Sequence, residues 1–254
     1  MNSVWHDEAG DPSAPLVVVV HGTMDRAAGM LKVSRRLDDR YRVLRYDRRG
    51  YGRSAPHDGP FGMNEQVADL VSLLDGRRAV LVGHSYGGNV ALATAARHVE
   101  LVAGVAVYEA PMSWERSWPG TTAGAVALAS HQDNETAAEL FMRRLVGDQR
   151  WEELPERTRA TRRAEGAALV GELGDLRANR PWDPAAIGVP VMLGCGSLGR
   201  PHHQQGMARM ASIIVGAELV TLENCRHDAP TSHPAEFCHT LLEPLFARVG
   251  SPWA

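Results

Sequence analysis

Short runs of apolar, often β-branched residues alternate along this chain with longer segments in which apolar residues recur every three or four positions. The segment Leu16–Val20 contains five consecutive apolar residues, which is typical of a strand covered on both faces. Runs of the same kind recur at 43–46, 79–82, 102–108, 189–193 and 218–222. Helical patterns between the runs predict the α/β class, with a mostly parallel central sheet and helices on both of its faces.

Five segments between these runs show helical periodicity, at 27–37, 64–74, 89–98, 203–213 and 234–248. In the second segment, Val67, Leu70, Val71 and Leu74 follow the spacing i, i+3, i+4 and i+7. This spacing puts the four side chains on one face of a helix.

The segment 112–183 interrupts the alternation. It has no strand pattern, contains helix-like pieces at 136–145 and 155–173, and ends at the Pro181–Pro184 run. We expect a helical cap over an active site, because the strands on either side of the segment belong to one sheet. The predicted domains are therefore a core of residues 1–111 and 184–254 and a cap of residues 112–183, with a separate small domain as the alternative.

Composition narrows the class of protein. Of the 254 residues, 44% are hydrophobic and 22% are charged, and the formal net charge is −3. This apolar fraction excludes a disordered chain, and the length suits one large domain or two small ones. Near-neutral charge argues against nucleic acid as a partner, because phosphate binding needs a concentrated basic surface.

The ends and the cysteines bear on the compartment. The first residues are acidic at Asp7, Glu8 and Asp11 and show no basic segment followed by an apolar one. No early apolar run approaches the roughly 20 residues that span a bilayer. Three cysteines, none in a CxxC pair, suggest neither a disulfide framework nor a zinc site. We expect a cytoplasmic protein that binds no membrane and no metal.

The strongest chemical signal is Gly83-x-Ser85-x-Gly87, which lies between the strand pattern at 79–82 and the helical pattern at 89–98. A serine on a sharp strand-to-helix turn needs small neighbours two residues away, and its hydroxyl projects above the sheet. The following helix N-terminus directs amides at developing negative charge. A chance match would lack these flanking elements, so Ser85 is the predicted nucleophile.

A second signal, His21-Gly22-Thr23, follows the first buried strand directly. Such a loop places a free backbone amide where a tetrahedral oxyanion forms. We expect the oxyanion donors to be the N–H groups of Thr23 and Tyr86, the latter following the nucleophile. His21 is interpreted as a structural hydrogen-bonding residue.

A serine hydroxyl is a weak nucleophile and needs a neutral imidazole to accept its proton. His227 follows the last strand pattern and precedes the final helical pattern, which suits the chain order of serine, acid and histidine. It is therefore the predicted base. The competing histidines are interpreted as surface or core residues: His98, His202, His203, His233 and His239.

Together these elements resemble the α/β-hydrolase superfamily over nearly the whole chain. A further motif of that superfamily, D-x-R-G-x-G-x-S, is matched by Asp47, Arg49, Gly50, Gly52 and Ser54, and we interpret this turn as scaffold. The resemblance implies the fold and the roles of Ser85 and His227. It says little about the substrate, because this fold carries many activities.

The triad acid departs from the superfamily pattern. Members usually carry an aspartate after the strand at 189–193, but residues 194–203 contain no carboxylate, and Ser197 occupies the expected place. Glu109 ends the strand at 102–108, which we expect beside the nucleophile strand, so it opens into the same crevice. The sequence also resembles a mostly bacterial subgroup with a "YEPP"-like strand end, in which this glutamate is the acid. A structural role for Glu109 near the cap hinge, Asp183 and Asp228 remain as alternatives.

The cap is expected to determine substrate choice. Four of the six tryptophans lie in it, at positions 114, 118, 151 and 182, and Trp114, Trp118 and Trp182 are the predicted substrate-binding residues. The alternative is that they pack the cap against the sheet. Four arginines at positions 157, 159, 162 and 163 suit either an anionic substrate or, preferably, a solvated helix face.

These residues predict a cytoplasmic serine hydrolase that cleaves an ester, lactone or thioester of a small, largely apolar acyl compound. No metal or organic cofactor is implied. The oligomeric state is left open, with a homodimer as one option. A C–C bond hydrolase or cofactor-free perhydrolase with the same triad is one alternative, and a non-catalytic binding protein or receptor is another. Dehalogenases and epoxide hydrolases of this architecture use an aspartate nucleophile, so Ser85 argues against both.

Overall fold

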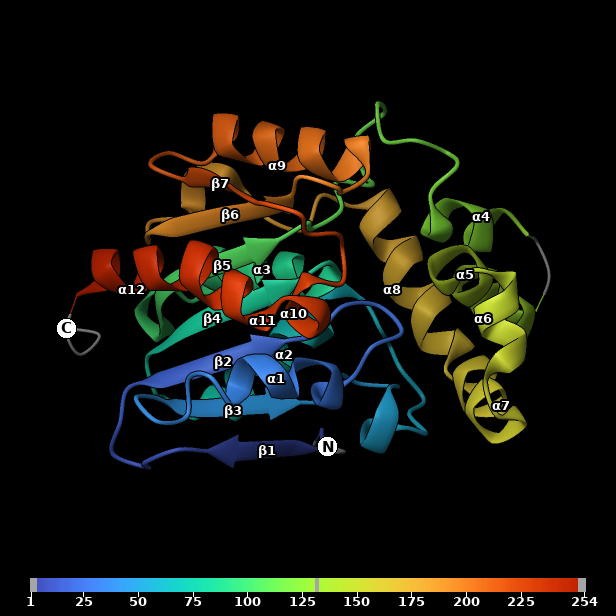
Figure 1. The fold of residues 1–254 in the computed structure, drawn as a ribbon, viewed down its shortest axis with the longest axis horizontal. Helices are drawn as coiled ribbons and strands as arrows, with labels where there is room; N and C mark the ends of the chain where they lie inside the picture. Colours follow the sequence, from blue (N-terminus) through green and yellow to red (C-terminus); the bar gives the residue numbers. More distant parts are fainter. Residues whose placement is uncertain (1–3, 131–132, 251–254) are drawn as a thin grey trace.

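A single seven-stranded sheet forms the centre of the molecule in the computed structural model, which describes residues 4–130 and 133–250 (Figure 1). The strands lie in the order β1-β3-β2-β4-β5-β6-β7. Their bounds are β1 His6–Ala9, β2 Leu16–Val20, β3 Arg42–Tyr46, β4 Ala79–His84, β5 Val102–Tyr108, β6 Val191–Gly196 and β7 Glu218–Leu222. Only β1 runs antiparallel to its neighbour, so the predicted mostly parallel sheet is confirmed.

The sheet is buried on both faces, which explains the continuous apolar runs. Along β2, Val17 and Val19 belong to one buried cluster, while Val18 and Val20 belong to another on the opposite face. Successive side chains of a strand point to opposite faces, so a strand covered on both sides has apolar residues at every position.

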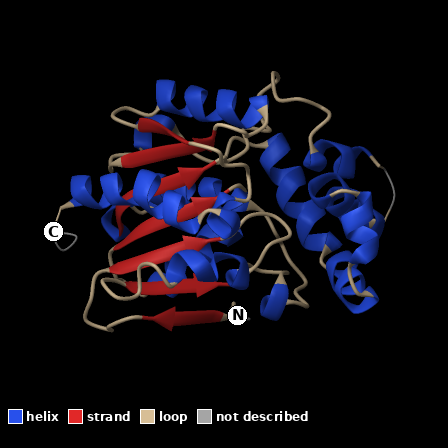
Figure 2. Ribbon diagram, viewed as in Figure 1, coloured by secondary structure: helices blue, strands red, loops and turns tan. Residues whose placement is uncertain are grey.

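Helices cover both faces (Figure 2). Near one face lie α1 (Leu31–Ser34), α10 (Ala229–Ser232), α11 (Pro234–Glu236) and α12 (Glu243–Val249), and against the other lie α2 (Met63–Leu74) and α3 (Tyr86–Arg97). Helix α9 (Pro201–Ile213) packs beside β6 and β7. The predicted helix at 27–37 is wrong in length, because a 3-10 turn at Ala27–Met30 precedes the single turn of α1.

The segment 112–183 contributes five helices and no strand within its described residues. They are α4 (Ala123–Ala129), α5 (Asn134–Val146), α6 (Asp148–Glu153), α7 (Glu156–Ala164) and α8 (Gly166–Ala178). They lie beyond the edge to which the parallel strands point (Figure 1). The predicted single helix at 155–173 is wrong, because the chain turns between α7 and α8. The turn brings Gly166 so close to the Asn134 carbonyl that a Cβ would not fit there.

Carboxylates on and just before α8 tie this segment to the sheet domain. Glu165 accepts a hydrogen bond from the Gly52 backbone N–H at 2.9 Å, and Asp175 accepts one from the Met63 N–H at 2.7 Å. Glu172 lies between them and is fully buried. No helix in the described part of the chain is long and apolar enough to cross a membrane.

Candidate active site

Ser85 occupies the turn between β4 and α3. Its backbone has φ 54° and ψ −125°, a strained conformation for a residue with a side chain. The turn is possible because its neighbours are glycines: a Cβ on Gly83 would lie 2.5 Å from the Gly87 carbonyl oxygen, and one on Gly87 would overlap the Val20 carbonyl. The Ser85 N–H donates to the Tyr108 carbonyl at 2.9 Å. The sequence therefore holds Ser85 at the carboxyl edge of the sheet, between β2 and β5.

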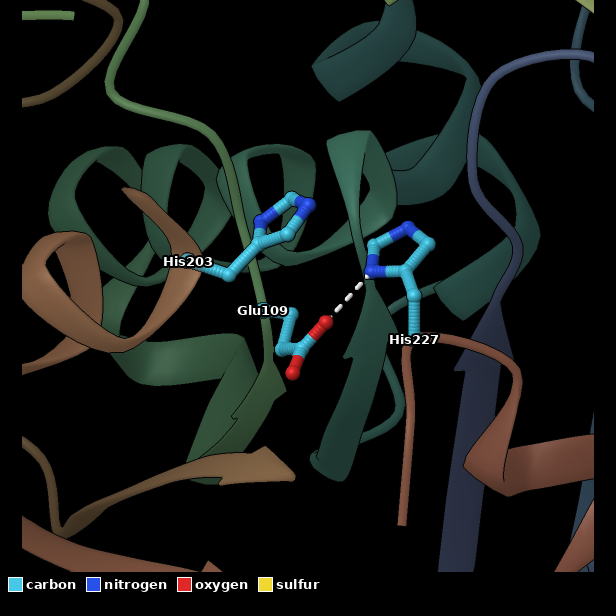
Figure 3. A group of neighbouring side chains, drawn as sticks. All are labelled: Glu109, His203 and His227. Carbon is cyan, nitrogen blue, oxygen red and sulfur yellow. Dashed lines mark hydrogen bonds and ion pairs between the residues drawn. The ribbon is translucent and has the colours of Figure 1, made fainter. Parts of the chain in front are cut away.

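Glu109 lies directly after β5 and contacts His227, which lies in the loop after β7 (Figure 3). Glu109 is fully buried, and its Oε2 lies 2.7 Å from His227 Nδ1. Its other oxygen, Oε1, accepts the Gly196 N–H at 2.9 Å. Because a carboxylate only accepts, the His227 proton is assigned to Nδ1, which leaves Nε2 free to accept a proton.

The other candidates for the triad acid are not paired with His227 in the described chain. Asp183 accepts the Ala185 N–H at 3.0 Å and caps a short turn. Asp228 precedes α10, where its backbone carbonyl accepts the Thr231 N–H. Ser197, which stands where the superfamily usually has an aspartate, accepts the Asn224 N–H at 2.8 Å. Among the described residues, Glu109 is the carboxylate paired with His227.

His84, the residue before the serine, supports the His227 loop. Its Nε2 lies 2.8 Å from the His227 carbonyl oxygen, and the two rings are 4.7 Å apart. The carbonyl must accept, so Nε2 carries the proton and the buried Nδ1, which has no partner, carries none. Burial, reinforced by His227, lowers the pKa of His84 to about 3. In the described chain no hydrogen bond joins the Ser85 hydroxyl to the His227 ring, a contact that is often long without substrate.

His203, from the first turn of α9, stacks on His227 with ring centroids 4.5 Å apart and planes 16° apart. Burial and the neighbouring His227 hold its pKa well below the usual histidine value. The sequence alone indicates only a surface or core role for His203 and does not distinguish His84 as a site residue. No local signal distinguishes either residue, because both positions become significant only when the loop after β7 folds over them.

Glu109, His203 and His227 each offer a possible metal-ligand atom, and these atoms lie within 4.8 Å of one another. The arrangement fits a hydrogen-bonded pair better than a metal site. His227 Nδ1 already bonds to Glu109 Oε2, and two nearly parallel rings direct their in-plane lone pairs side by side. Figure 3 shows the His203 ring beside this pair.

The two predicted oxyanion donors flank the serine. Tyr86 is the first residue of α3, and Thr23 is buried in the loop after β2. Gly22 lies against the nucleophile, since a Cβ on it would come within 2.9 Å of Ser85 Cβ. Beneath this loop lies a buried ion pair that sequence reasoning missed, between Arg48 and Glu172. Arg48 is at the first unspecified position (x) of the D-x-R-G-x-G-x-S turn, which the sequence alone predicts to be scaffold.

The predicted substrate-binding tryptophans have different surroundings. Trp182 is 3% exposed and donates from Nε1 to Asn89 Oδ1 at 3.0 Å, and Trp114 packs edge-on against it at 5.6 Å. Trp118 is half-buried and lies 5.1 Å from the His202 ring and 6.0 Å from the His203 ring. Trp118 therefore contacts the ring of His203, which stacks on His227, while Trp182 packs against α3.

The arginines of the cap, at positions 157, 159, 162 and 163, differ in their surroundings, and Arg162 donates to the Met24 carbonyl at 2.7 Å. Arg159 and Arg163 form ion pairs with cap glutamates, among them Glu156. An open hollow elsewhere on the surface is lined by several arginines, among them Arg26, Arg45, Arg53, Arg157 and Arg162. Arg159 and Arg163 therefore belong to an ion-paired helix face on the surface of the cap.

Known proteins share parts of this sequence. The model of the alpha/beta hydrolase family matches residues 17–240. Epoxide hydrolase A of Mycobacterium tuberculosis is 36% identical over 122 residues, which cover 46% of this chain and 38% of that protein. A 2-(acetamidomethylene)succinate hydrolase of Mesorhizobium japonicum is 32% identical over 96 residues, covering 37% of this chain and 34% of that protein. The chain thus matches little more than a third of these curated relatives.

Among solved structures, the enol-lactonase of Burkholderia xenovorans superimposes with a TM-score of 0.73. The match covers 93% of this chain and 94% of the lactonase, at 24% sequence identity. The likeness therefore concerns the fold alone.

Proposed function

This chain belongs to the alpha/beta hydrolase family, and we propose that it is a serine hydrolase acting on a carboxylic ester, lactone or thioester. The single observation that carries the proposal is the pairing of Glu109 with His227 at 2.7 Å, beside the serine turn. The substrate class is a diffusible small molecule with a largely apolar acyl group.

In the proposed reaction, the Ser85 oxygen attacks the substrate carbonyl carbon while His227 Nε2 accepts the hydroxyl proton. The tetrahedral intermediate collapses to an acyl-enzyme as His227 returns this proton to the leaving oxygen or sulfur. A water molecule then attacks the acyl-enzyme, His227 accepts its proton, and the acid leaves as Ser85 recovers the proton. Glu109 keeps the Nδ1 proton in place and stabilises the imidazolium that forms twice in this cycle.

The proposed oxyanion donors are the backbone N–H groups of Thr23 and Tyr86. Tyr86 is at the N-terminus of α3, where unpaired amides and the helix dipole favour negative charge. The loop that carries Thr23 lies against Ser85, as the 2.9 Å approach of a Cβ on Gly22 indicates. Both donors are thus close to the reacting carbonyl in the proposed complex.

Relatives with other chemistry do not alter this proposal. Epoxide hydrolases with this architecture are expected to use an aspartate nucleophile, whereas this chain has Ser85 at the turn. A C–C bond hydrolase would use the same three side chains, so substrate profiling separates it from an esterase.

Covalent labelling tests the proposal directly. A fluorophosphonate probe should add one label per chain, and peptide mapping should place that label on Ser85. Ser85→Ala should abolish both the label and the hydrolysis of short-chain p-nitrophenyl esters. Ser212→Ala, a matched change at an exposed serine of α9, should leave both intact. A folded wild-type protein that takes no label would point to a binding protein and overturn the proposal.

A further inference from the structure

A buried ion pair joins the cap to the loop after β3. Arg48 and Glu172, a residue of α8, are both fully buried, and Nη1 of the arginine lies 2.5 Å from Oε2 of the glutamate. A second contact, from Nη2 to Oε1 at 3.2 Å, makes the pair bidentate. Charges removed from water in this way are tolerated only when their geometry and remaining hydrogen bonds are satisfied.

The carboxylate of Glu172 is satisfied by donors from the sheet domain. Its Oε1 accepts the Thr23 hydroxyl at 2.6 Å and the Tyr51 hydroxyl at 2.8 Å, in addition to Arg48. One carboxylate of the cap thus receives bonds from the loop after β2 and from the loop after β3. A fully satisfied buried network of this kind has a single low-energy arrangement.

Arg48 holds the backbone of the loop that contains Thr23. Its Nε donates to the His21 carbonyl at 3.0 Å, and its Nη2 donates to the Gly22 carbonyl at 3.1 Å. The Arg48 N–H donates to His21 Nε2 at 2.9 Å, so the His21 proton is on Nδ1, 2.7 Å from the Gly22 carbonyl. Burial and the Arg48 charge hold the pKa of His21 well below 6.5, which preserves this tautomer.

Two side-chain donors, from Arg48 and His21, therefore fix the direction of the Gly22 carbonyl together with the Asp25 backbone N–H at 3.4 Å. The peptide between Gly22 and Thr23 is trans, so its N–H points opposite to its carbonyl. Because the carbonyl faces Arg48 and Gly22 lies against Ser85, the Thr23 N–H is directed away from the arginine, on the side of the nucleophile.

We propose that Arg48 and Glu172 are positioning residues that orient the Thr23 N–H toward the oxyanion of the reaction. The inference rests on the proposed function for its catalytic consequence. The cap then does more than cover the site, because α8 supplies the counter-charge without which Arg48 would be an unpaired buried cation. The oxyanion loop is complete only when α8 is docked.

Two threonine substitutions form a matched test, because each replaces a buried hydroxyl donor by a methyl group. Thr23→Val removes the bond from the oxyanion loop to Glu172 Oε1 and retains the backbone N–H. Thr94→Val removes a bond to the Val90 carbonyl within α3, outside the Arg48–Glu172 network. We expect Thr23→Val to lower kcat tenfold or more with KM little changed, Thr23→Ser to restore it, and Thr94→Val to leave kcat within twofold of wild type.

A second readout follows the oxyanion itself. A trifluoromethyl ketone adds reversibly to an active serine to give a charged tetrahedral adduct, so its affinity should fall with kcat in Thr23→Val and stay unchanged in Thr94→Val. Glu172→Gln should weaken the same affinity at least tenfold if it folds. Because Glu172→Gln leaves Arg48 without its counter-charge and so risks unfolding the protein, the test relies first on the two substitutions that each remove one hydroxyl group.

Crystal structures of Thr23→Val and Thr94→Val complete the test without any need for turnover. The inference expects the Gly22–Thr23 peptide to shift or lose order in the first variant and to stay in place in the second. Equal effects of the two substitutions on kcat, or a peptide that does not move in either variant, would overturn it. A wild-type protein without label or turnover would instead overturn the proposed function, and the crystallographic comparison would still decide the positioning role.

Discussion

The Cα of Gly199 lies against the Glu109 carboxylate so closely that a Cβ on the glycine would come within 2.5 Å of Glu109 Oε1. Gly199 belongs to the loop after β6, where the superfamily usually has its acidic residue. Here the same loop has a glycine that leaves room for a carboxylate from β5, together with the Gly196 N–H that binds it. The loop after β6 thus has no acidic residue of its own and instead leaves room for, and binds, the carboxylate of Glu109.

Gly199→Ala should lower kcat by tenfold or more. The added methyl group must push Glu109 Oε1 or the loop aside, which disturbs the hydrogen bond to His227. The measurement is steady-state ester hydrolysis together with the thermal midpoint of unfolding. Gly174→Ala is the control, because nothing lies within 4 Å of a Cβ at that helical position. A Gly199→Ala enzyme as active as wild type would show that the carboxylate has more freedom than the contact indicates.

How far the sequence predicts this fold depends on how local each signal is. Strands β2 and β5 were predicted because burial on both faces demands continuous apolar residues. Strand β1 was missed because it is a charged edge strand, whose residues Asp7 and Glu8 pair with Arg45 and Arg42 on β3. Those contacts exist only after the sheet has formed.

Strand β6 illustrates a different limit. The sequence predicts a strand at 189–193, but the strand extends over Val191–Gly196, and Gly194 and Gly196 pair with Val220 and Leu222 of β7. Glycine carries no side-chain pattern that would indicate a strand. In β6 the glycines leave room instead: a Cβ on Gly196 would lie 2.8 Å from the Tyr108 hydroxyl.

The candidate site divides in the same way. Ser85 is marked by its own neighbours, and the absence of a carboxylate at 194–203 directs attention to Glu109. The stacking of His203 on His227, and the pairing of Arg48 with Glu172 across 124 residues, depend on how distant segments meet. No pattern within a short window carries that information.

Glu109→Gln should lower kcat by orders of magnitude with the fold intact. The amide preserves the size of the side chain but removes the charge that offsets the His227 imidazolium. In a well-studied serine protease, the equivalent change costs about 10⁴ in kcat. The measurement is kcat by ester hydrolysis, with circular dichroism to check folding. Asp183→Asn and Asp228→Asn are controls that should retain most activity, and a large loss in either would point to a different acid.

Substitution of Trp182 should affect stability, whereas substitution of Trp118 should affect substrate preference. Trp182→Phe removes the donor to Asn89 Oδ1 within the core and should lower the free energy of unfolding by about 1–3 kcal/mol, with substrate preference unchanged. Trp118→Ala should change KM and acyl-length preference several-fold, because its ring lies beside His202 and His203. The measurements are urea unfolding and a series of p-nitrophenyl esters. A shift in acyl-length preference in Trp182→Phe would place that residue in the pocket instead.

Stability should fall as the pH is lowered from about 6.5, before most carboxylates titrate. The pKa of His84 is lowered by burial to about 3, and burial lowers the pKa values of His21 and His203 as well. In the unfolded chain a histidine has its ordinary pKa of about 6.5, so below that pH the unfolded state binds more protons than the folded state. The free energy of unfolding therefore rises with pH up to about pH 6.5, and the contribution of these histidines is complete only above that pH.

Between pH 7 and pH 5, His84 alone should contribute a loss of about 2 kcal/mol in the free energy of unfolding. Urea unfolding at pH 7, 6 and 5 measures the slope. His84→Gln keeps a side-chain N–H for the His227 carbonyl and has no group that titrates here, so its stability should fall less over the same range by about that amount. Equal slopes for the two proteins would contradict this prediction. They would mean that the folded protein protonates His84 as readily as the unfolded chain does, although its buried Nδ1 has no hydrogen-bond partner.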